Sequence, residues 1–307
     1  MNKQLIPKPT HGSLEWLQIR HRDPNGRCIV GASEVSTLMN ANQYETIGDL
    51  AVRKLMQPEV TAPNEAMRRG NILESALLQY ASEELRLDID TPEVMYLNDR
   101  IISTLDGRAK FPDDHVIVEA KTNNFWSHGQ ELPSSWFWQA QAQMFCTGTD
   151  LVQFVVLDKH MRLGMDMVER HERSVEHMIE AVESFCTAID EERLPDDIAL
   201  TVPQVNDLYP KAEGEVELDH SSLMLIDEWN AIKEAMKDLD SKEKRVKDAL
   251  ANLLRDSEFG SVNGQRVLSF KSQSAKRFDS KALVAAHPEL ETQFTTQSSF
   301  RVLRVVK

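Results

Sequence analysis

A strand-like run at residues 116–126, VIVEAKTNNFW, contains a carboxylate and an amine within an otherwise apolar segment. Because side chains alternate between the two faces of a strand, Glu119 and Lys121 share a face with Ile117, and the residues between them share the other. Charged groups on a half-buried strand are costly unless they are paired or bound to an ion. The run therefore predicts a sheet that carries a polar site, in which a metal ion or a reactive water compensates the charges.

The strands that precede this run supply a second carboxylate. Period-two patterns separated by turn signals predict an antiparallel meander of three strands, at residues 94–98, 101–109 and 115–122. Asp106 lies at the end of the middle strand, so a short antiparallel connection brings it beside Glu119 and Lys121. The backbone carbonyl of Ala120 is then a further oxygen ligand.

Oxygen ligands from one or two carboxylates, together with retained waters, are what Mg²⁺ prefers. Such an ion polarises a phosphodiester and lowers the pKa of a bound water. Lys121 would orient the attacking water or stabilise charge on phosphorus, and Glu74, on a preceding amphipathic helix, would complete the metal shell directly or through water. The pattern predicts metal-assisted phosphodiester hydrolysis; the alternative is an ordinary strand whose charges face solvent.

Apolar spacing predicts helices before and after the strands. A helix begins at about Ser33, and the other expected elements are helices at residues 46–56, 64–87, 134–148 and 171–194 and a buried strand at residues 151–158. This order predicts an α/β (α+β) fold with a mixed sheet.

Prolines and the loss of periodicity after residue 194 indicate a domain boundary. We expect a core at residues 1–200, a linker at 201–215, a long helix or helical hairpin at 216–257 and a small module at 258–307. The expected module contains a hairpin at Asn263-Gly264, a short helix capped by Asp279 or Ser280 and a final strand. The module holds eight Lys/Arg and four Asp/Glu, which is a weak indication of an acidic partner.

Composition excludes several classes of protein. A net charge of −14 argues against a broadly basic surface that coats nucleic acid, so any DNA contact must be local. No apolar run is long enough for a membrane span or a signal peptide, which predicts no membrane association. The three cysteines are widely spaced and fit neither a disulfide framework nor a thiolate metal site, which predicts a reducing cytoplasm.

Four motifs occur in the order found in one nuclease family. LDGRA followed by VEAKT resembles the PD-(D/E)XK signature, and its surroundings resemble the lambda-exonuclease, YqaJ-type viral recombinase branch. IVGASEVSTLM, RRGNILE and WFWQAQAQMFCTG are similar to that branch's N-terminal motif, glutamate helix and glutamine helix. The resemblance covers roughly residues 13–195 and implies a restriction-endonuclease-like core in which helices flank a central mixed sheet.

The resemblance also implies a role for each matching residue. Asp106, Glu119, the Ala120 carbonyl and Glu74 would be metal ligands, Lys121 the catalytic lysine and Gln139 a glutamine that aids the site. A pocket for a 5′-phosphate would use Arg20, Ser33 and Thr104, because hydroxyls and a guanidinium suit phosphate. An insertion after Arg20 leaves Arg22 and Arg27 as alternatives for the arginine.

By the same resemblance we expect a Mg²⁺-dependent exonuclease, with Mn²⁺ as the alternative ion, that degrades double-stranded DNA ends 5′ to 3′ and leaves 3′ overhangs for recombination. A ring-shaped homo-oligomer such as a trimer, a single-strand annealing protein as partner, and a phage or mobile-element origin with action in the bacterial cytoplasm are further expectations. The alternatives are an endonuclease or structure-specific nuclease of the same fold, and a non-catalytic module that binds DNA ends.

Overall fold

A computed structural model describes residues 3–60, 62, 64–110, 115–196, 198–296 and 300–305. The chain divides into two compact units, Met1–Tyr209 and Pro210–Lys307. Among the described residues, no helix combines the length and the apolar character that crossing a membrane requires.

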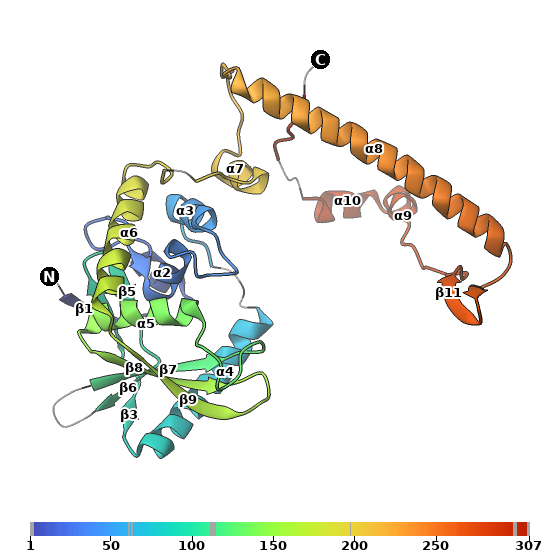
Figure 1. Ribbon diagram of the computed structural model, residues 1–307. Coiled ribbons are helices and arrows are strands. Elements are labelled where there is room, and N and C mark those ends of the chain that lie inside the picture. Colours follow the sequence, from blue (N-terminus) through green and yellow to red (C-terminus); the bar gives the residue numbers. More distant parts are fainter. Residues whose placement is uncertain are drawn as a thin grey trace. The chain divides into compact units, whose positions relative to one another are not determined.

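The first unit is built on a five-stranded sheet with the order β3-β6-β7-β8-β9 (Figure 1). Only β7 and β8 run parallel; the other neighbours are antiparallel, so the sheet is mixed. The strands are β3 (Ile89–Asp90), β6 (Gly107–Lys110), β7 (His115–Thr122), β8 (Leu151–Leu157) and β9 (Leu163–Glu169). The edge strand β9 was not predicted, since its buried and exposed residues do not alternate regularly.

One helix covers each face of this sheet. On one face, α4 (Glu65–Leu85) packs Leu77 and Ala81 against Val118 of β7 and Val155 of β8. On the other face, α5 (Ser134–Thr147) packs in a cluster that includes Trp136, Ala140 and Met144 from the helix and Ile117, Val152 and Phe154 from the strands. The predicted α/β (α+β) arrangement, in which helices flank a central mixed sheet, is therefore confirmed.

Local signals set the ends of these two helices. The Asn64 side chain accepts a hydrogen bond from the Met67 amide at the start of α4, as expected of an N-cap asparagine. At the end of α5, Gly148 has a φ of 86°, a left-handed conformation that glycine adopts without the steric cost of a side chain. The predicted stop at Gly148 is therefore confirmed.

The predicted three-stranded meander is wrong in one respect. The run 101–109 forms two strands in different sheets, because the chain leaves one sheet after Ser103 and buries Leu105 in the core before β6 begins. The first of these strands joins a four-stranded sheet made of β1 (Lys3–Pro7), β4 (Val94–Asn98), β5 (Ile101–Ser103) and β2 (Val30–Gly31). Of the pairings predicted for the meander, only that of β6 with β7 lies in the sheet that carries Glu119.

The described residues of the first unit form five further helices: α1 (Leu14–Ile19), α2 (Ala32–Leu38), α3 (Ile47–Leu55), α6 (Glu172–Asp190) and α7 (Val202–Leu208). α2 packs on α5 and α6, and the shared core includes Val35, Phe145 and Met178. Within the segment 201–215, which was predicted to be a linker, α7 packs on α3.

The second unit contains α8 (Ser221–Leu254), β10 (Phe259–Val262), β11 (Gln265–Ser269), α9 (Ser280–Ala286) and α10 (Pro288–Phe294). α8 is one uninterrupted helix, so the helical hairpin that the sequence left open is not formed. The hairpin of β10 and β11 turns at Asn263-Gly264 as predicted, and Asp279 caps α9. The predicted final strand is wrong for residues 300–305, because β10 and β11 pair only with each other among the described residues.

Phe154 tests the packing of α5 on the sheet. Its ring is fully buried and stacks on Trp136 with a centroid distance of 5.6 Å. We expect Phe154→Ala to lower the free energy of unfolding by about 3–5 kcal/mol, because the truncation leaves a cavity. Urea unfolding followed by tryptophan fluorescence measures this loss.

Phe125→Ala is the matched control. Phe125 is 75% exposed, so the same truncation should change stability by no more than about 0.5 kcal/mol. Equal losses in the two variants would contradict the assigned packing.

Candidate active site

The Glu119 carboxylate lies on the α5 side of β7 and is almost completely buried, with its side chain 3% exposed. Its Oε1 accepts hydrogen bonds from the Lys121 ammonium and the Gln139 amide, both on this face. Its Oε2 accepts a hydrogen bond of 2.6 Å from Gln143 Nε2. The predicted shared face of Glu119 and Lys121 is therefore confirmed, and α5 supplies two amides to the same carboxylate.

Lys121 connects the strand with the helix. Its Nζ lies 2.8 Å from Glu119 Oε1 and donates a hydrogen bond of 3.0 Å to Gln139 Oε1. Burial alone would lower the pKa of Lys121, but the negative charges of Glu119 and Asp106 outweigh it, so the pKa is raised. Lys121 is therefore a fully charged ammonium, held in one place by two acceptors.

Asp106 lies directly before β6, and the antiparallel register of β6 and β7 brings it beside Glu119 and Ala120. Its Oδ2 accepts a hydrogen bond of 3.0 Å from the Ala120 amide. Burial raises the pKa of Asp106 well above its usual value, and the negative charge of Glu119 raises it further. The predicted neighbourhood of Asp106, Glu119 and Lys121 is therefore present.

Glu74 lies on α4 and reaches the same group of charges. Burial raises its pKa; the charge of Lys8 opposes that shift, and the charge of Glu119 adds to it. We call Glu74, Asp106, Glu119 and Lys121 the carboxylate centre. It contains three carboxylates and one ammonium, so its charge is not balanced by its own residues.

Among the described residues, no three Asp, Glu, His or Cys side chains gather closely enough to form a complete metal-ligand group. The donors of α5 and the Lys121 ammonium converge on Glu119. The donor set nevertheless fits a hard divalent cation, because it consists of carboxylate oxygens with an excess of negative charge.

Gln143 is a site residue that the sequence did not single out. It is fully buried, and its Oε1 has no protein hydrogen-bond partner within the described structure. The signal that identifies it is its spacing: Gln143 follows Gln139 by four residues, which places both amides on one face of a helix.

A cavity of about 620 Å³ lies among α1, α2 and α3, and its lining includes Arg20, Ser33, Arg53 and Lys54. The Arg20 guanidinium lies over the Trp16 ring, 4.4 Å from its centroid, and donates a hydrogen bond of 3.3 Å to Ser33 Oγ. We call this space the Arg20 cavity. The structure thus brings together two of the three residues predicted to bind a 5′-phosphate.

Gly31 leaves room for the arginine. A Cβ atom at this position would overlap the Arg20 guanidinium, so a side chain here would displace that group from Ser33. Thr104, the third predicted phosphate ligand, is half-buried between β5 and β6 and is not part of the cavity lining. The alternative arginines have other partners, since Arg22 donates to the backbone of His21 and Lys54, and Arg27 pairs with Asp23.

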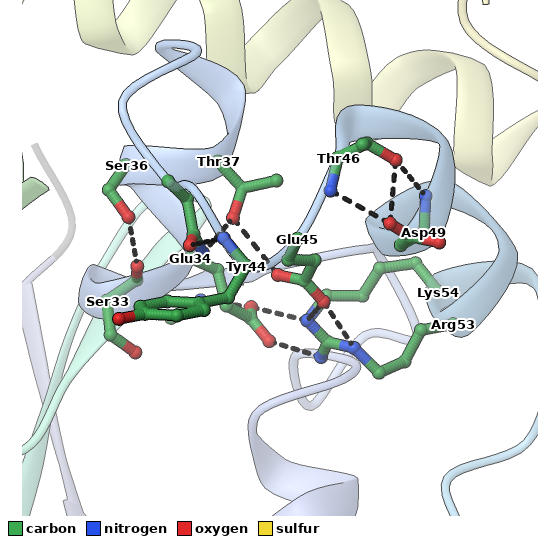
Figure 2. Close-up of polar contacts among 12 residues, drawn as sticks. Ser33, Glu34, Ser36, Thr37, Tyr44, Glu45, Thr46, Asp49, Arg53 and Lys54 are labelled. Carbon is green, nitrogen blue, oxygen red and sulfur yellow. Dashed lines mark hydrogen bonds and ion pairs between the residues drawn. The ribbon is translucent and has the colours of Figure 1, made fainter. Parts of the chain in front are cut away.

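A buried carboxylate, Glu34, organises the cations of this cavity (Figure 2). It accepts a hydrogen bond from Arg53, pairs with Lys54 Nζ at 2.8 Å and accepts a hydrogen bond of 2.7 Å from the Gly31 amide. Burial would raise the pKa of Glu34, but the charges of Lys54 and Arg53 hold it far below the usual range. Lys54 in turn donates to the Arg20 carbonyl at 2.9 Å, which ties the network to the cavity.

Residues 15–150 match a protein family described as the YqaJ-like viral recombinase domain. The chain is thus similar, over a little under half of its length, to the YqaJ-like viral recombinase family. The matched segment contains every residue that the sequence predicted for the metal site and the phosphate pocket. The resemblance inferred from the four motifs is therefore confirmed.

A relative and two solved structures are similar to the chain. The YqaJ protein of Bacillus subtilis strain 168 is 21% identical, over 94% of this chain and 92% of the relative. An alkaline exonuclease from Laribacter hongkongensis is 22% identical, over 59% of this chain and 94% of that chain, with a TM-score of 0.48. A phage-related exonuclease from Haemophilus somnus 129PT is 13% identical, over 54% and 95% of the two chains, with a TM-score of 0.43.

Gln143→Leu tests the role of α5 in holding the buried carboxylate. The substitution removes the donor to Glu119 Oε2, so we expect the metal-free protein to lose about 1–3 kcal/mol of stability. The matched control is Gln79→Leu, at an exposed position of α4, which should change stability by no more than about 0.5 kcal/mol. Urea unfolding of both variants without divalent ions is the measurement, and equal losses would count against the assigned contact.

Proposed function

We propose that this chain is a metal-dependent DNA exonuclease that degrades double-stranded ends 5′ to 3′ and leaves 3′ overhangs for phage-type recombination. The observation that carries the proposal is the carboxylate centre: Lys121 is held on Glu119 beside Asp106, on the central strand of a mixed sheet. Such a group suits hydrolysis of a phosphodiester better than a purely structural ion pair, because its negative charge exceeds its positive charge.

Asp106, Glu119 and the Ala120 carbonyl would hold Mg²⁺, or Mn²⁺ as the alternative, with Glu74 binding directly or through water. When bound, the ion polarises the phosphate and makes a water more acidic. Lys121 would donate a hydrogen bond to the attacking water or to a phosphate oxygen. Gln139 contacts both Lys121 and Glu119, and would keep the ammonium aimed at the scissile group.

The Arg20 cavity would receive the terminal 5′-phosphate. A guanidinium held against a hydroxyl is a strong donor pair for phosphate. The lining contains three cations and five acids, so the cavity as a whole is not basic. Arg53 and Lys54 pair with Glu34, whereas the Arg20 guanidinium donates to the Ser33 hydroxyl. Arg20 would therefore be the local DNA contact that the net charge of −14 still permits.

Structures similar to this chain include the Laribacter alkaline exonuclease in complex with dAMP. From the resemblance of the four motifs we further propose a double-stranded DNA substrate, a single-strand annealing partner, a ring-shaped homo-oligomer and action in the bacterial cytoplasm. An endonuclease of the same fold is the second candidate, because the carboxylate centre alone does not dictate a free end. Covalently closed circular DNA separates the two: an exonuclease leaves it intact, whereas an endonuclease nicks it.

Lys121→Ala tests the proposed role of the ammonium in phosphodiester cleavage. We expect loss of cleavage by at least about 100-fold with DNA binding retained, because the amine would stabilise charge in the transition state. The substrates are linear duplexes labelled at either 5′ or 3′ ends, with Mg²⁺ or with EDTA. Early release of the 5′ label only when Mg²⁺ is present is the expected pattern for the unmodified protein.

Lys159→Ala, at an exposed position after β8, is the control and should cleave normally. Normal turnover by Lys121→Ala would refute the assigned role, and cleavage in EDTA would refute the metal requirement.

The end chemistry of the DNA tests the Arg20 cavity. Duplexes with 5′-phosphate ends should be digested about 10-fold faster or more than duplexes with 5′-hydroxyl ends, because a charge-assisted contact is absent in the latter. Arg20→Ala should abolish this difference, whereas Arg27→Ala should leave it unchanged. Equal rates on both kinds of end by the unmodified protein would rule out phosphate recognition in this cavity.

A further inference from the structure

α8 exposes a regular apolar stripe along its whole length. The stripe residues recur at alternating intervals of four and three: Leu225, Trp229, Ile232, Met236, Leu239, Glu243, Val246, Leu250 and Leu253. Leu225, Ile232, Met236, Leu239, Val246 and Leu253 are all about half exposed or more. Glu243 is the one charged residue in this series.

This spacing is a heptad repeat. With Trp229, Met236, Glu243 and Leu250 at position a, every d position from Leu225 to Leu253 is aliphatic. An apolar repeat of 3.5 residues is typical of a helix that packs on another helix as a coiled coil. The apolar stripe that it forms is narrower than the stripe of an ordinary surface helix. The helix of 34 residues is about 50 Å long, which is enough for four heptads.

We propose that α8 pairs with α8 of a second copy of this chain, in an antiparallel coiled coil. The second copy is favoured because the charges beside the stripe complement each other under a two-fold axis. In an antiparallel pair, position g faces position g of the other helix. With Ala235 near the axis, Glu228 of each copy then lies opposite Lys242 of the other.

A parallel pair would meet two repulsive contacts. Position g would face the next position e, which sets Lys242 against Lys247 of the other copy, and the two Glu243 side chains would meet in the apolar seam. In the antiparallel pair Glu243 instead faces an aliphatic d position near Leu225, where it keeps its ion pair with Lys247 of the same helix, at 2.7 Å. The charges therefore select the antiparallel orientation.

The first experiment measures assembly in the full chain by sedimentation equilibrium. Leu239→Asp places a charge in the centre of the seam and should halve the mass of the assembly. Leu223→Asp is the matched control, since Leu223 is exposed on the same helix but outside the stripe, at position b; it should leave the mass unchanged. Circular dichroism verifies that both variants keep their helices, and an unchanged mass for Leu239→Asp overturns the proposal.

The second experiment determines whether the two α8 helices pair in the antiparallel orientation. All three native cysteines are buried, so one introduced cysteine reports on its own neighbourhood. Ala235→Cys should form a disulfide-linked dimer under mild oxidation, because position g near the two-fold axis faces itself. Met236→Cys should not, because position a faces position d of the other helix. Cross-linking of Met236→Cys without Ala235→Cys would overturn the antiparallel arrangement, and cross-linking of neither variant would overturn the pairing.

Discussion

The buried charge of Glu119 is the constraint around which the first unit is arranged. A carboxylate on the inner face of β7 must be fully hydrogen-bonded, and it obtains its donors from Lys121 on the same strand and from Gln139 and Gln143 on α5. The apolar contacts of Phe154 with Trp136 fix the same helix against the same sheet. The polar and the apolar contacts therefore hold α5 at the same distance from the sheet. That distance lets Gln139 position the Lys121 ammonium.

The two functional regions of this unit present different charged groups to a ligand. In the carboxylate centre, three acids face one ammonium, and the raised pKa of Asp106 reflects burial and the acids beside it. Around the Arg20 cavity, Glu34 is held ionised by Lys54 and Arg53, and the Arg20 guanidinium lies against the Ser33 hydroxyl. Under the proposed function the carboxylate centre would bind a divalent cation and the guanidinium would bind a phosphate.

Alternation along a strand and the shortness of one connection were sufficient to predict that Glu119, Lys121 and Asp106 lie together. They were not sufficient to predict which sheet each strand joins. The run 101–109 has the two-residue alternation of a single strand throughout, but it contributes strands to two sheets, because the burial of Leu105 redirects the chain. Gln143 escaped prediction because a glutamine in a helix is ordinarily exposed, and only the position of Glu119 explains its burial. Lys54 is similar, since nothing in its neighbours shows that Glu34 compensates a buried ammonium.

The two functional regions also differ in how much of the chain they need. Apart from Glu74, the carboxylate centre and its glutamines fall between Asp106 and Gln143, within one hairpin and the helix that follows it. The lining of the Arg20 cavity extends from Trp16 to Asp207, since α7 contributes to it. Because domains begin to fold as they leave the ribosome, a nascent chain that has emerged only as far as α6 already contains the residues of the hydrolytic machinery. It acquires the full wall of the end-recognition cavity only when α7 has also emerged.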